Sequence, residues 1–210
     1  ASLAGFTILQ ISDLHRGTEM AQEDISRAVR LALQQEADLV VLTGDYVSRG
    51  DYVSRPGGVS QFGDYALSCA EALSPLCSLG DVLACLGNHD HWTDADAVSG
   101  ALGGVGIAVL RNEAREAADG LWVAAVDDVW EQQADLEQAL EEAPAGAAVV
   151  LLAHEPDYAD EAAADGRVSL QLSGHSHGGQ VRLPFIGAPV TPYLARKYQA
   201  GLYQVGAMWL

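Results

Sequence analysis

The sequence predicts an α/β fold, because short apolar segments alternate along the chain with segments of helical periodicity. The apolar segments are rich in Val, Ile and Leu, which is typical of strands buried within a sheet. Apolar residues recur at helical spacing around Ile25 and Val29 and again around Leu136 and Leu140. We therefore expect amphipathic helices that cover buried sheets. The expected strands are residues 6–12, 39–42, 81–86, 107–110, 121–126, 147–153 and 170–173.

The size and hydrophobic content of the chain indicate one domain. With 210 residues, of which 49% are hydrophobic, the chain can bury the core of a single compact domain over residues 1–210. No stretch is apolar for long enough to cross a bilayer. The sequence starts at Ala1 without an initiator methionine and ends at Trp209-Leu210 in what looks like a further strand, so we expect a chain trimmed at both ends.

The chain is strongly acidic. It has 11 basic and 29 acidic residues and a net charge of −18. A surface with this charge repels nucleic acids and anionic membranes unless a local positive charge offsets it. Bound metal ions would supply such a charge. We therefore expect no nucleic-acid partner.

The cysteines do not indicate a disulfide or metal site. Cys69, Cys77 and Cys85 are odd in number and form no CxxC pair. A disulfide framework and a thiolate zinc site are therefore not indicated, and we expect the three side chains in the core.

A hexapeptide, GDYVSR, occurs twice in succession, at residues 44–49 and 50–55. Only the first copy follows an apolar strand directly. We therefore assign chemistry to Asp45 of the first copy and expect the second copy to be a loop.

Ionisable residues gather just after the expected strands. Asp13 and His15 follow the first strand, Asp45 follows the second, and His154 follows a later one. All six histidines fall in these clusters, which nothing in an ordinary core requires. Because ligands bind at the carboxyl ends of strands in layered α/β folds, we expect these loops to converge on one site. The histidines are His15, His89, His91, His154, His175 and His177.

The donor groups in these clusters predict a site for two metal ions. Imidazole and carboxylate groups without thiolates suit Mn, Fe, Zn or a similar divalent ion. The donors exceed the three or four protein ligands that one catalytic ion takes, so we expect two ions that share a bridging carboxylate. Glycines beside the donors, such as Gly44 and Gly174, allow sharp turns. The expected metal ligands are Asp13, His15, Asp45, Asn88, His154, His175 and His177.

Five motifs follow the expected strands in order. They are Asp13-Leu14-His15, Gly44-Asp45, Gly87-Asn88-His89-Asp90, His154 and Gly174-His175-Ser176-His177. Together they resemble the motifs of the calcineurin-like metallophosphoesterase superfamily, over nearly the whole chain. Residues 126–130, 154–157 and 172–180 are more narrowly similar to a bacterial phosphodiesterase branch that includes UDP-diacylglucosamine hydrolase-like proteins. The resemblance implies a four-layer α/β/β/α sandwich with a dimetal site at the carboxyl ends of the strands.

The resemblance also implies how the ligands are shared between the ions. His89 is left to act on the substrate, and Asp45 bridges. The implied ligands are Asp13, His15, Asp45 and His177 for one ion, and Asp45, Asn88, His154 and His175 for the other.

The chain departs from the superfamily pattern at Ser48. Many members have an Asp three residues after the bridging Asp, where it orients the catalytic His, and this chain has Ser48 there. Asp90 and Asp51 are the alternative candidates for orienting His89. Ser48→Asp is expected to be tolerated, because it restores the carboxylate that is found in relatives.

The donor set and the resemblance together predict a metal-dependent phosphoesterase, with phosphodiesters expected ahead of phosphomonoesters. A hydroxide that bridges the ions would attack phosphorus, and His89 would assist the leaving oxygen. The alternatives are a phosphomonoesterase and a non-catalytic interaction scaffold on the same fold. A scaffold should lack ligands or His89, and this chain lacks neither. The negative charge disfavours a nuclease, and so does the lack of a basic stretch in the sequence that could line a groove for nucleic acid.

Other residues near the motifs have simpler expected roles. His91 is expected at the rim of the site or in solvent. Asp127 and Asp128 are expected in a strand-end turn, although they recur in the resembling branch. Three of the four tryptophans are expected to pack, because no basic stripe interleaves them. These are Trp92, Trp122 and Trp130.

The segment after His177 leaves two alternatives open. Residues 181–194 are apolar and rich in Pro, and Arg182, Arg196 and Lys197 lie within and after them. The segment either packs on the sheet edge, with its cations paired to carboxylates, or forms an apolar lip at the mouth of the site. A lip would suit a small-molecule or lipid-linked phosphodiester and peripheral membrane contact. The sequence indicates no oligomeric state.

Overall fold

The computed structural model describes residues 3–48, 61–185 and 187–210. The second GDYVSR copy, with its Asp51, lies outside the described residues, and so does Ile186. By its internal contacts the chain divides into two compact units, an N-terminal unit over Ser2–Val109 and a C-terminal unit from Leu110 to Leu210. The sequence predicted a single domain over residues 1–210. The division into two units does not test that statement, which remains a prediction.

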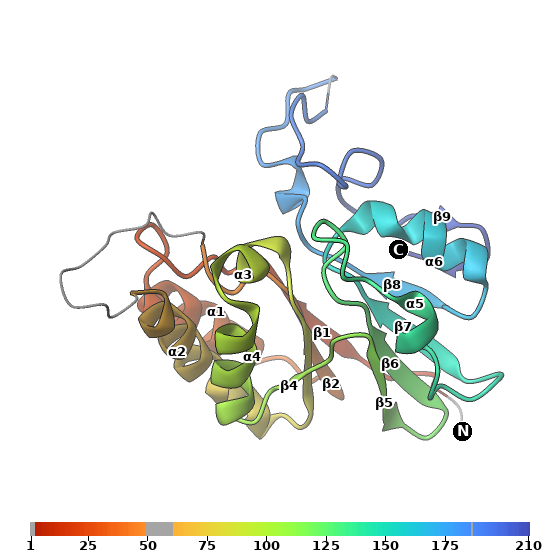
Figure 1. The fold of residues 1–210 in the computed structure, drawn as a ribbon, viewed down its shortest axis with the longest axis horizontal. Coiled ribbons are helices and arrows are strands. Elements are labelled where there is room, and N and C mark those ends of the chain that lie inside the picture. The colour runs from red at the N-terminus through yellow and green to blue at the C-terminus, as the bar shows by residue number, and fades with distance from the viewer. Residues whose placement is uncertain (1–2, 49–60, 186) are drawn as a thin grey trace. The chain divides into compact units, whose positions relative to one another are not determined.

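The N-terminal unit contains a parallel sheet with the strand order β1-β2-β3-β4. Every residue of β2 and β3 is buried, which explains why both strands read as unbroken apolar runs. Parallel pairing places the carboxyl ends of all its strands at one edge of the sheet (Figure 1). The strands are β1 (Ile8–Ile11), β2 (Leu39–Thr43), β3 (Val82–Cys85) and β4 (Ala108–Val109).

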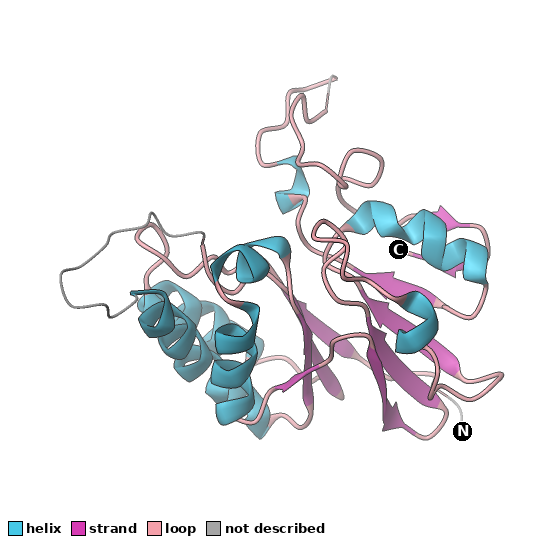
Figure 2. Ribbon diagram, in the orientation of Figure 1, coloured by secondary structure: helices cyan, strands magenta, loops and turns pink. Residues whose placement is uncertain are grey.

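Helices accompany this sheet, and Figure 2 shows them grouped beside its strands. The predicted helix around Ile25 is α1, which buries Ile25, Val29 and Ala32 on one face. Helix α2 contacts both α1 and α4. The helices of this unit are α1 (Gln22–Ala32), α2 (Gln61–Leu73), α3 (Asn88–Thr93) and α4 (Ala95–Gly104), with a 3-10 helix, η1, at Ser74–Ser78.

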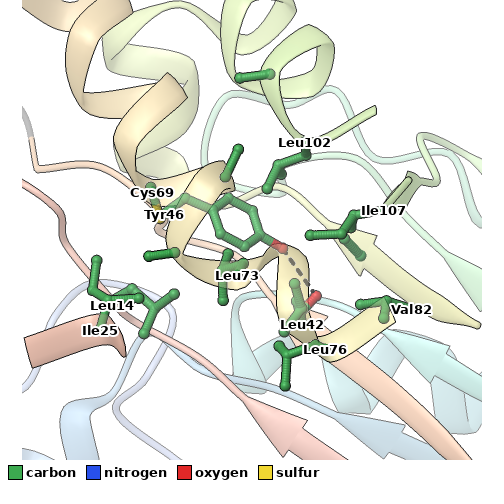
Figure 3. Packing of buried hydrophobic residues seen from close by; sticks show 14 of the residues in the cluster. Leu14, Ile25, Leu42, Tyr46, Cys69, Leu73, Leu76, Val82, Leu102 and Ile107 are labelled. Atoms are coloured by element: carbon green, nitrogen blue, oxygen red, sulfur yellow. Dashed lines mark hydrogen bonds between the residues drawn. The ribbon is translucent and has the colours of Figure 1, made fainter. Parts of the chain in front are cut away.

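Tyr46 lies in the core of the N-terminal unit, where its ring packs among aliphatic side chains (Figure 3). Its hydroxyl donates to the carbonyl oxygens of Cys85 at 2.8 Å and of Leu42 at 3.2 Å. Burial raises the pKa of Tyr46 well above its ordinary value, so the ring acts as a neutral hydrogen-bond donor. Cys69 and Cys85 are buried, as predicted, and none of the three cysteines is in a disulfide.

The C-terminal unit contains a mixed sheet with the strand order β5-β6-β7-β8-β10-β9. Strands β6, β7, β8 and β10 are parallel, whereas β5 and β9 pair antiparallel at the two edges. The strands are β5 (Glu113–Ala118), β6 (Leu121–Ala125), β7 (Ala148–Leu152), β8 (Leu170–Leu172), β9 (Gln204–Val205) and β10 (Met208–Trp209). The helices are α5 (Leu136–Ala139) and α6 (Ala159–Asp165), with 3-10 helices η2 (Pro156–Tyr158) and η3 (His177–Gly179).

The structure confirms the predicted α/β fold, with two sheets and accompanying helices. Strand β5 was not among the expected strands, because its sequence EAREAA lacks the β-branched residues that favour strands. It forms by antiparallel pairing with β6 across the turn at Asp119 and Gly120. An Asp-Gly pair is a hairpin signal, and Gly120 has the positive φ of 79° that such a turn requires. Within the described part of the chain, no helix is long and apolar enough to span a membrane.

Candidate metal centre

In the N-terminal unit, the loops after β1 and β2 are tied together by their backbones. The amide of Asp13 donates to the carbonyl oxygen of Gly44 at 3.1 Å, and the amide of His15 donates to that of Asp45 at 2.9 Å. The pairing of the two strands therefore continues into the loops. It places the side chains that follow β1 beside those that follow β2.

The carboxylate of Asp90 joins the loop after β2 to the loop after β3. Asp90 is fully buried. Its Oδ1 accepts from the amides of Tyr46 at 2.9 Å and Val47 at 3.3 Å, and its Oδ2 accepts from those of Asp45 and Gly87, both at 2.9 Å. The sequence suggested Asp90 only as a partner for His89. The signal for its structural role is its position three residues after Gly87, the spacing of a capping box at the start of α3.

Donor atoms of His15, Asp45 and His89 lie within 4.8 Å of one another. His15 Nε2 is 3.5 Å from Asp45 Oδ2 and 3.9 Å from Asp13 Oδ1. The amide of His89 donates to Asp45 Oδ1 at 2.9 Å. The N-terminal unit thus gathers imidazole and carboxylate donors in the small volume that a metal ion requires.

The side-chain oxygen of Asn88 fits a metal site as well. Asn88 is buried, and its Oδ1 has no hydrogen-bond partner among the described residues. A buried carbonyl oxygen without a partner costs about 1–3 kcal/mol, so such an atom indicates a partner from outside the chain. A divalent cation that takes nitrogen and oxygen ligands is a suitable partner.

Most of the predicted ligands have left-handed backbone conformations. A positive φ is uncommon for residues other than glycine and costs roughly 1–2 kcal/mol. Conformations of this kind persist where the surrounding structure holds them, and they concentrate at functional sites. The left-handed ligands are Asp13 (φ 55°), His15 (47°), Asp45 (56°), His175 (65°) and His177 (48°).

In the C-terminal unit, His154 follows β7, and His175 and His177 follow β8. The amide of Gly174 donates to the carbonyl oxygen of His154 at 3.0 Å, which ties the two loops together. The rings of His154 and His175 meet edge to face, with centroids 5.0 Å apart. His177 begins η3 and is exposed. His154 and His175 are thus brought together within this unit.

The ring of His175 has a defined tautomer. Its Nε2 lies 2.7 Å from the carbonyl oxygen of Tyr193. A carbonyl oxygen only accepts, so Nε2 carries the proton, and in the neutral ring the lone pair is on Nδ1. Histidines that bind metals through one nitrogen typically donate from the other in this way. The geometry therefore suits His175 to bind a cation through Nδ1.

Two tryptophans pack, as expected, but they pack against imidazoles of the predicted site. The ring centroid of Trp92 is 4.9 Å from that of His89. The ring of Trp130 contacts the rings of His175 and Tyr193 edge to face, with centroid distances of 5.6 Å and 5.3 Å. No feature of the sequence distinguished these two tryptophans from residues of an ordinary core.

The acidic pair after β6 forms a turn, as predicted. Asp128 Oδ1 accepts from the amide of Glu131 at 2.6 Å, and Asp127 Oδ1 accepts from that of Asp128 at 2.9 Å. Asp127 Oδ2 also accepts from Arg111 Nε at 2.7 Å.

Glu155, the residue after His154, is fully buried, and burial raises the pKa of its carboxyl to about 8.

Ser48 supports a ligand loop. Its hydroxyl donates to the carbonyl oxygen of His15 at 2.9 Å, and its amide donates to that of Arg16 at 3.0 Å. The residue at this position therefore holds the loop that carries His15.

The family model described as calcineurin-like phosphoesterase matches residues 6–179. The chain belongs to this family. The predicted superfamily is therefore confirmed, and the chain is a metal-dependent phosphoesterase. The donor sets in both units fit the divalent ions that this family implies.

Two curated relatives match nearly the whole chain. YkuE of Bacillus subtilis (strain 168), an uncharacterized metallophosphoesterase, is 34% identical over 208 residues, which cover 97% of this chain and 69% of YkuE. The phosphodiesterase YaeI of Escherichia coli (strain K12) is 35% identical over 209 residues, which cover 97% of this chain and 72% of YaeI. The crystal structure of TT1561 of Thermus thermophilus has a TM-score of 0.55 at 15% identity, with 80% of each chain covered. That likeness supports the fold alone.

Proposed function

We propose that this phosphoesterase hydrolyses phosphodiesters with two divalent metal ions. The observation that carries the proposal is the arrangement of three proposed ligands: His15 Nε2 lies 3.5 Å from Asp45 Oδ2 and 3.9 Å from Asp13 Oδ1, and all three residues have left-handed backbone. The proposed ligands are Asp13, His15, Asp45 and His177 for one ion, and Asp45, Asn88, His154 and His175 for the other, with Asp45 shared.

When bound, the two ions would supply Lewis-acid charge to the phosphate oxygens and lower the pKa of water. His89 would donate a proton to the leaving oxygen or stabilise it, a role typically worth about 10²–10⁴ in rate. Its ring contacts the rings of His15, at a centroid distance of 4.7 Å, and Trp92, at 4.9 Å. Its amide is fixed by Asp45. These contacts hold the imidazole in one place before the substrate binds.

Two observations favour a diester over a monoester. A monoester carries a second negative charge, and the chain has only 11 basic residues against 29 acidic ones to meet it. The relative YaeI is named a phosphodiesterase. A non-catalytic scaffold is the less favoured alternative, because every proposed ligand and His89 are present.

The substrate that we propose is a small-molecule or lipid-linked phosphodiester with an apolar part. The packing alternative for residues 181–194 does not fit the exposure of their apolar side chains, since Phe185 is fully exposed and Val190 is 81% exposed. In one respect the packing alternative does fit, because the nearby Lys197 Nζ pairs with Asp160 Oδ1 at 2.6 Å. The segment would thus meet a substrate or a membrane surface through apolar groups. We expect no nucleic-acid substrate.

A cavity in the N-terminal unit also suits an apolar group. It has a volume of about 420 Å³ and extends from Asp13 along α1. Leu14, Met20, Ile25 and Leu31 contribute apolar walls, and Glu19, Asp24 and Arg27 add charged groups to the lining. Cavities of this size hold small-molecule ligands, and Asp13 would place a bound group beside the metal ions.

A matched pair of assays tests the proposal. Metal-free protein is reconstituted with Mn, Fe, Co or Zn and assayed on a chromogenic phosphodiester and on the corresponding monoester, with metal content measured in parallel. We expect the diester to have the higher kcat/KM. Comparable or faster monoester hydrolysis would contradict the diester preference.

His89→Asn and Asp45→Asn separate the roles of acid and ligand. We expect His89→Asn to keep both ions and lower kcat by about 10²–10⁴. Asp45→Asn should lose metal, because the bridging position needs a carboxylate. Loss of metal from His89→Asn would show that His89 is a ligand.

A further inference from the structure

We infer that Asp157 is a positioning residue for His175. It fixes the backbone of residues 194–198, and this segment holds the preceding residue, Tyr193, whose carbonyl oxygen accepts from the His175 ring. The inference rests on the proposed function, in which His175 is a metal ligand.

The first step is the contact between His175 and Tyr193. His175 is only 4% exposed, and its Nε2 donates to the Tyr193 carbonyl oxygen at 2.7 Å. This bond keeps the proton on Nε2 and the lone pair on Nδ1. It also fixes the rotation of the ring, as outer partners of metal-binding histidines do.

The second step is the backbone that holds this carbonyl group. The next residue, Leu194, has a φ of 67°, which is unfavourable for a leucine and persists only where contacts impose it. The carbonyl oxygen of Leu194 accepts from the amide of Asp157 at 2.9 Å. Tyr193 itself is held by its side chain, because its ring packs edge to face against Trp130.

The third step is the Asp157 side chain. Its Oδ2 accepts from the amide of Arg196 at 2.9 Å, and its Oδ1 accepts from those of Lys197 at 3.0 Å and Tyr198 at 3.1 Å. Both oxygens are used, so an amide in place of the carboxylate would direct an NH₂ group at N–H donors. Asp157 therefore specifies the path of residues 194–198 through charge-assisted bonds.

The consequence is a connection between two proposed ligands. Asp157 lies three residues after His154 and on the 3-10 helix η2 that follows it. Through residues 194–198 it reaches the carbonyl oxygen that binds His175. Asp157 is held three residues after one proposed ligand, His154, and would thus also help to set the position of another, His175.

Asp157→Asn tests the inference, with Asp160→Asn as the matched control. Asp160 binds the same segment through side chains only, accepting from Lys197 Nζ at 2.6 Å and from the Tyr198 hydroxyl at 2.9 Å. Titration of metal-free protein with Co or Mn gives the affinity for each ion. We expect Asp157→Asn to weaken one ion by about 10–100-fold and Asp160→Asn to change neither by more than about twofold.

A second readout needs no metal. In metal-free wild-type protein, ¹H–¹⁵N NMR should show His175 with a protected Nε2–H and an unprotonated Nδ1. The protected signal should disappear in Asp157→Asn and persist in Asp160→Asn. A wild-type ring protonated on Nδ1 alone would overturn the inference even if Asp157→Asn failed to fold.

Unchanged NMR signals and metal affinities in folded Asp157→Asn would overturn it too. Failure of the proposed function would look different. Wild-type protein would then bind no metal or hydrolyse no diester, while the NMR signals would still separate the two variants.

Discussion

At the scale of single residues, two carboxylates beside the motifs, the buried Asp90 and the half-buried Asp157, bind backbone amides. Asp90 accepts four such bonds and Asp157 accepts from three amides. Charge-assisted bonds of this kind are short and about twice as strong as neutral ones. These carboxylates therefore act as fixed points for the loops that carry the proposed ligands.

Asp90→Asn should destabilise the protein. An amide group replaces one oxygen by NH₂, and each Asp90 oxygen accepts from two buried N–H groups. We expect the free energy of unfolding in urea to fall by roughly 2–4 kcal/mol. The control is Asp94→Asn, since Asp94 caps the exposed start of α4 and asparagine caps equally well. An Asp90→Asn variant as stable as the control would remove the structural role of Asp90.

Ser48→Asp should weaken the loop that carries His15. The Ser48 hydroxyl donates to the His15 carbonyl oxygen, whereas an ionised carboxylate cannot donate and would face that oxygen. We therefore replace the expectation that Ser48→Asp is tolerated with an expected loss of about 1–3 kcal/mol in stability. Ser48→Ala, which only removes the donor, should lose less, about 0.5–1.5 kcal/mol. Urea unfolding of both variants measures these two losses. A Ser48→Asp variant that is more stable than Ser48→Ala would show instead that the carboxylate is tolerated at this position.

At the scale of elements, the connection after η3 exposes the apolar side chains of Val181, Leu183, Phe185 and Val190 rather than packing them. Leu183 and Gly187 pair as an isolated antiparallel bridge, with backbone hydrogen bonds of 2.8 and 2.9 Å. Phe185, between them, has a φ of 67° and a fully exposed side chain. A segment that holds an aromatic ring in solvent is suited to contact an apolar group of another molecule.

Phe185→Ser should affect long-chain substrates selectively. We expect kcat/KM for a diester with a long acyl chain to fall about tenfold, which corresponds to about 1.4 kcal/mol of lost apolar contact. A short soluble diester should change less than about twofold, and stability should not change because the ring is exposed. Leu67→Ser on α2, which removes another exposed apolar side chain, is the control. Equal effects on both substrates would argue against contact between Phe185 and substrate.

At the scale of the whole molecule, the dominant property is a net charge of −18. Two divalent cations would reduce this charge where the carboxylates of the proposed site are closest, and charge repulsion in the folded chain would fall. Metal binding should therefore stabilise the fold as well as support the reaction.

Chelation should abolish activity, and Mn, Fe, Co or Zn should restore it. At a free metal concentration of 100 times Kd, each ion bound only by the folded state adds about 2.7 kcal/mol to stability. Thermal unfolding and turnover, measured across a metal titration, should rise together. Full turnover by metal-free protein would exclude the two-metal proposal.

Much of the fold and the positions of the motifs could be predicted from the sequence alone. Strands β2 and β3 are buried on both faces, so they had to read as unbroken apolar runs. The motif residues Asp13 and Asp45 could be placed at strand ends because the strands before them were recognisable. Strand β5 was missed, since its Ala and Glu residues carry no strand signal and antiparallel pairing with β6 forms it.

Only the tertiary structure decided which groups support the proposed ligands. Asp90 binds amides of two loops, Ser48 binds the His15 carbonyl oxygen, and the Tyr193 carbonyl oxygen binds His175. Every residue has a carbonyl group and nearly every residue an amide, so such partners leave no mark in a sequence. Residue types therefore determined which side chains could bind metal, while the path of the backbone determined what holds those side chains in place.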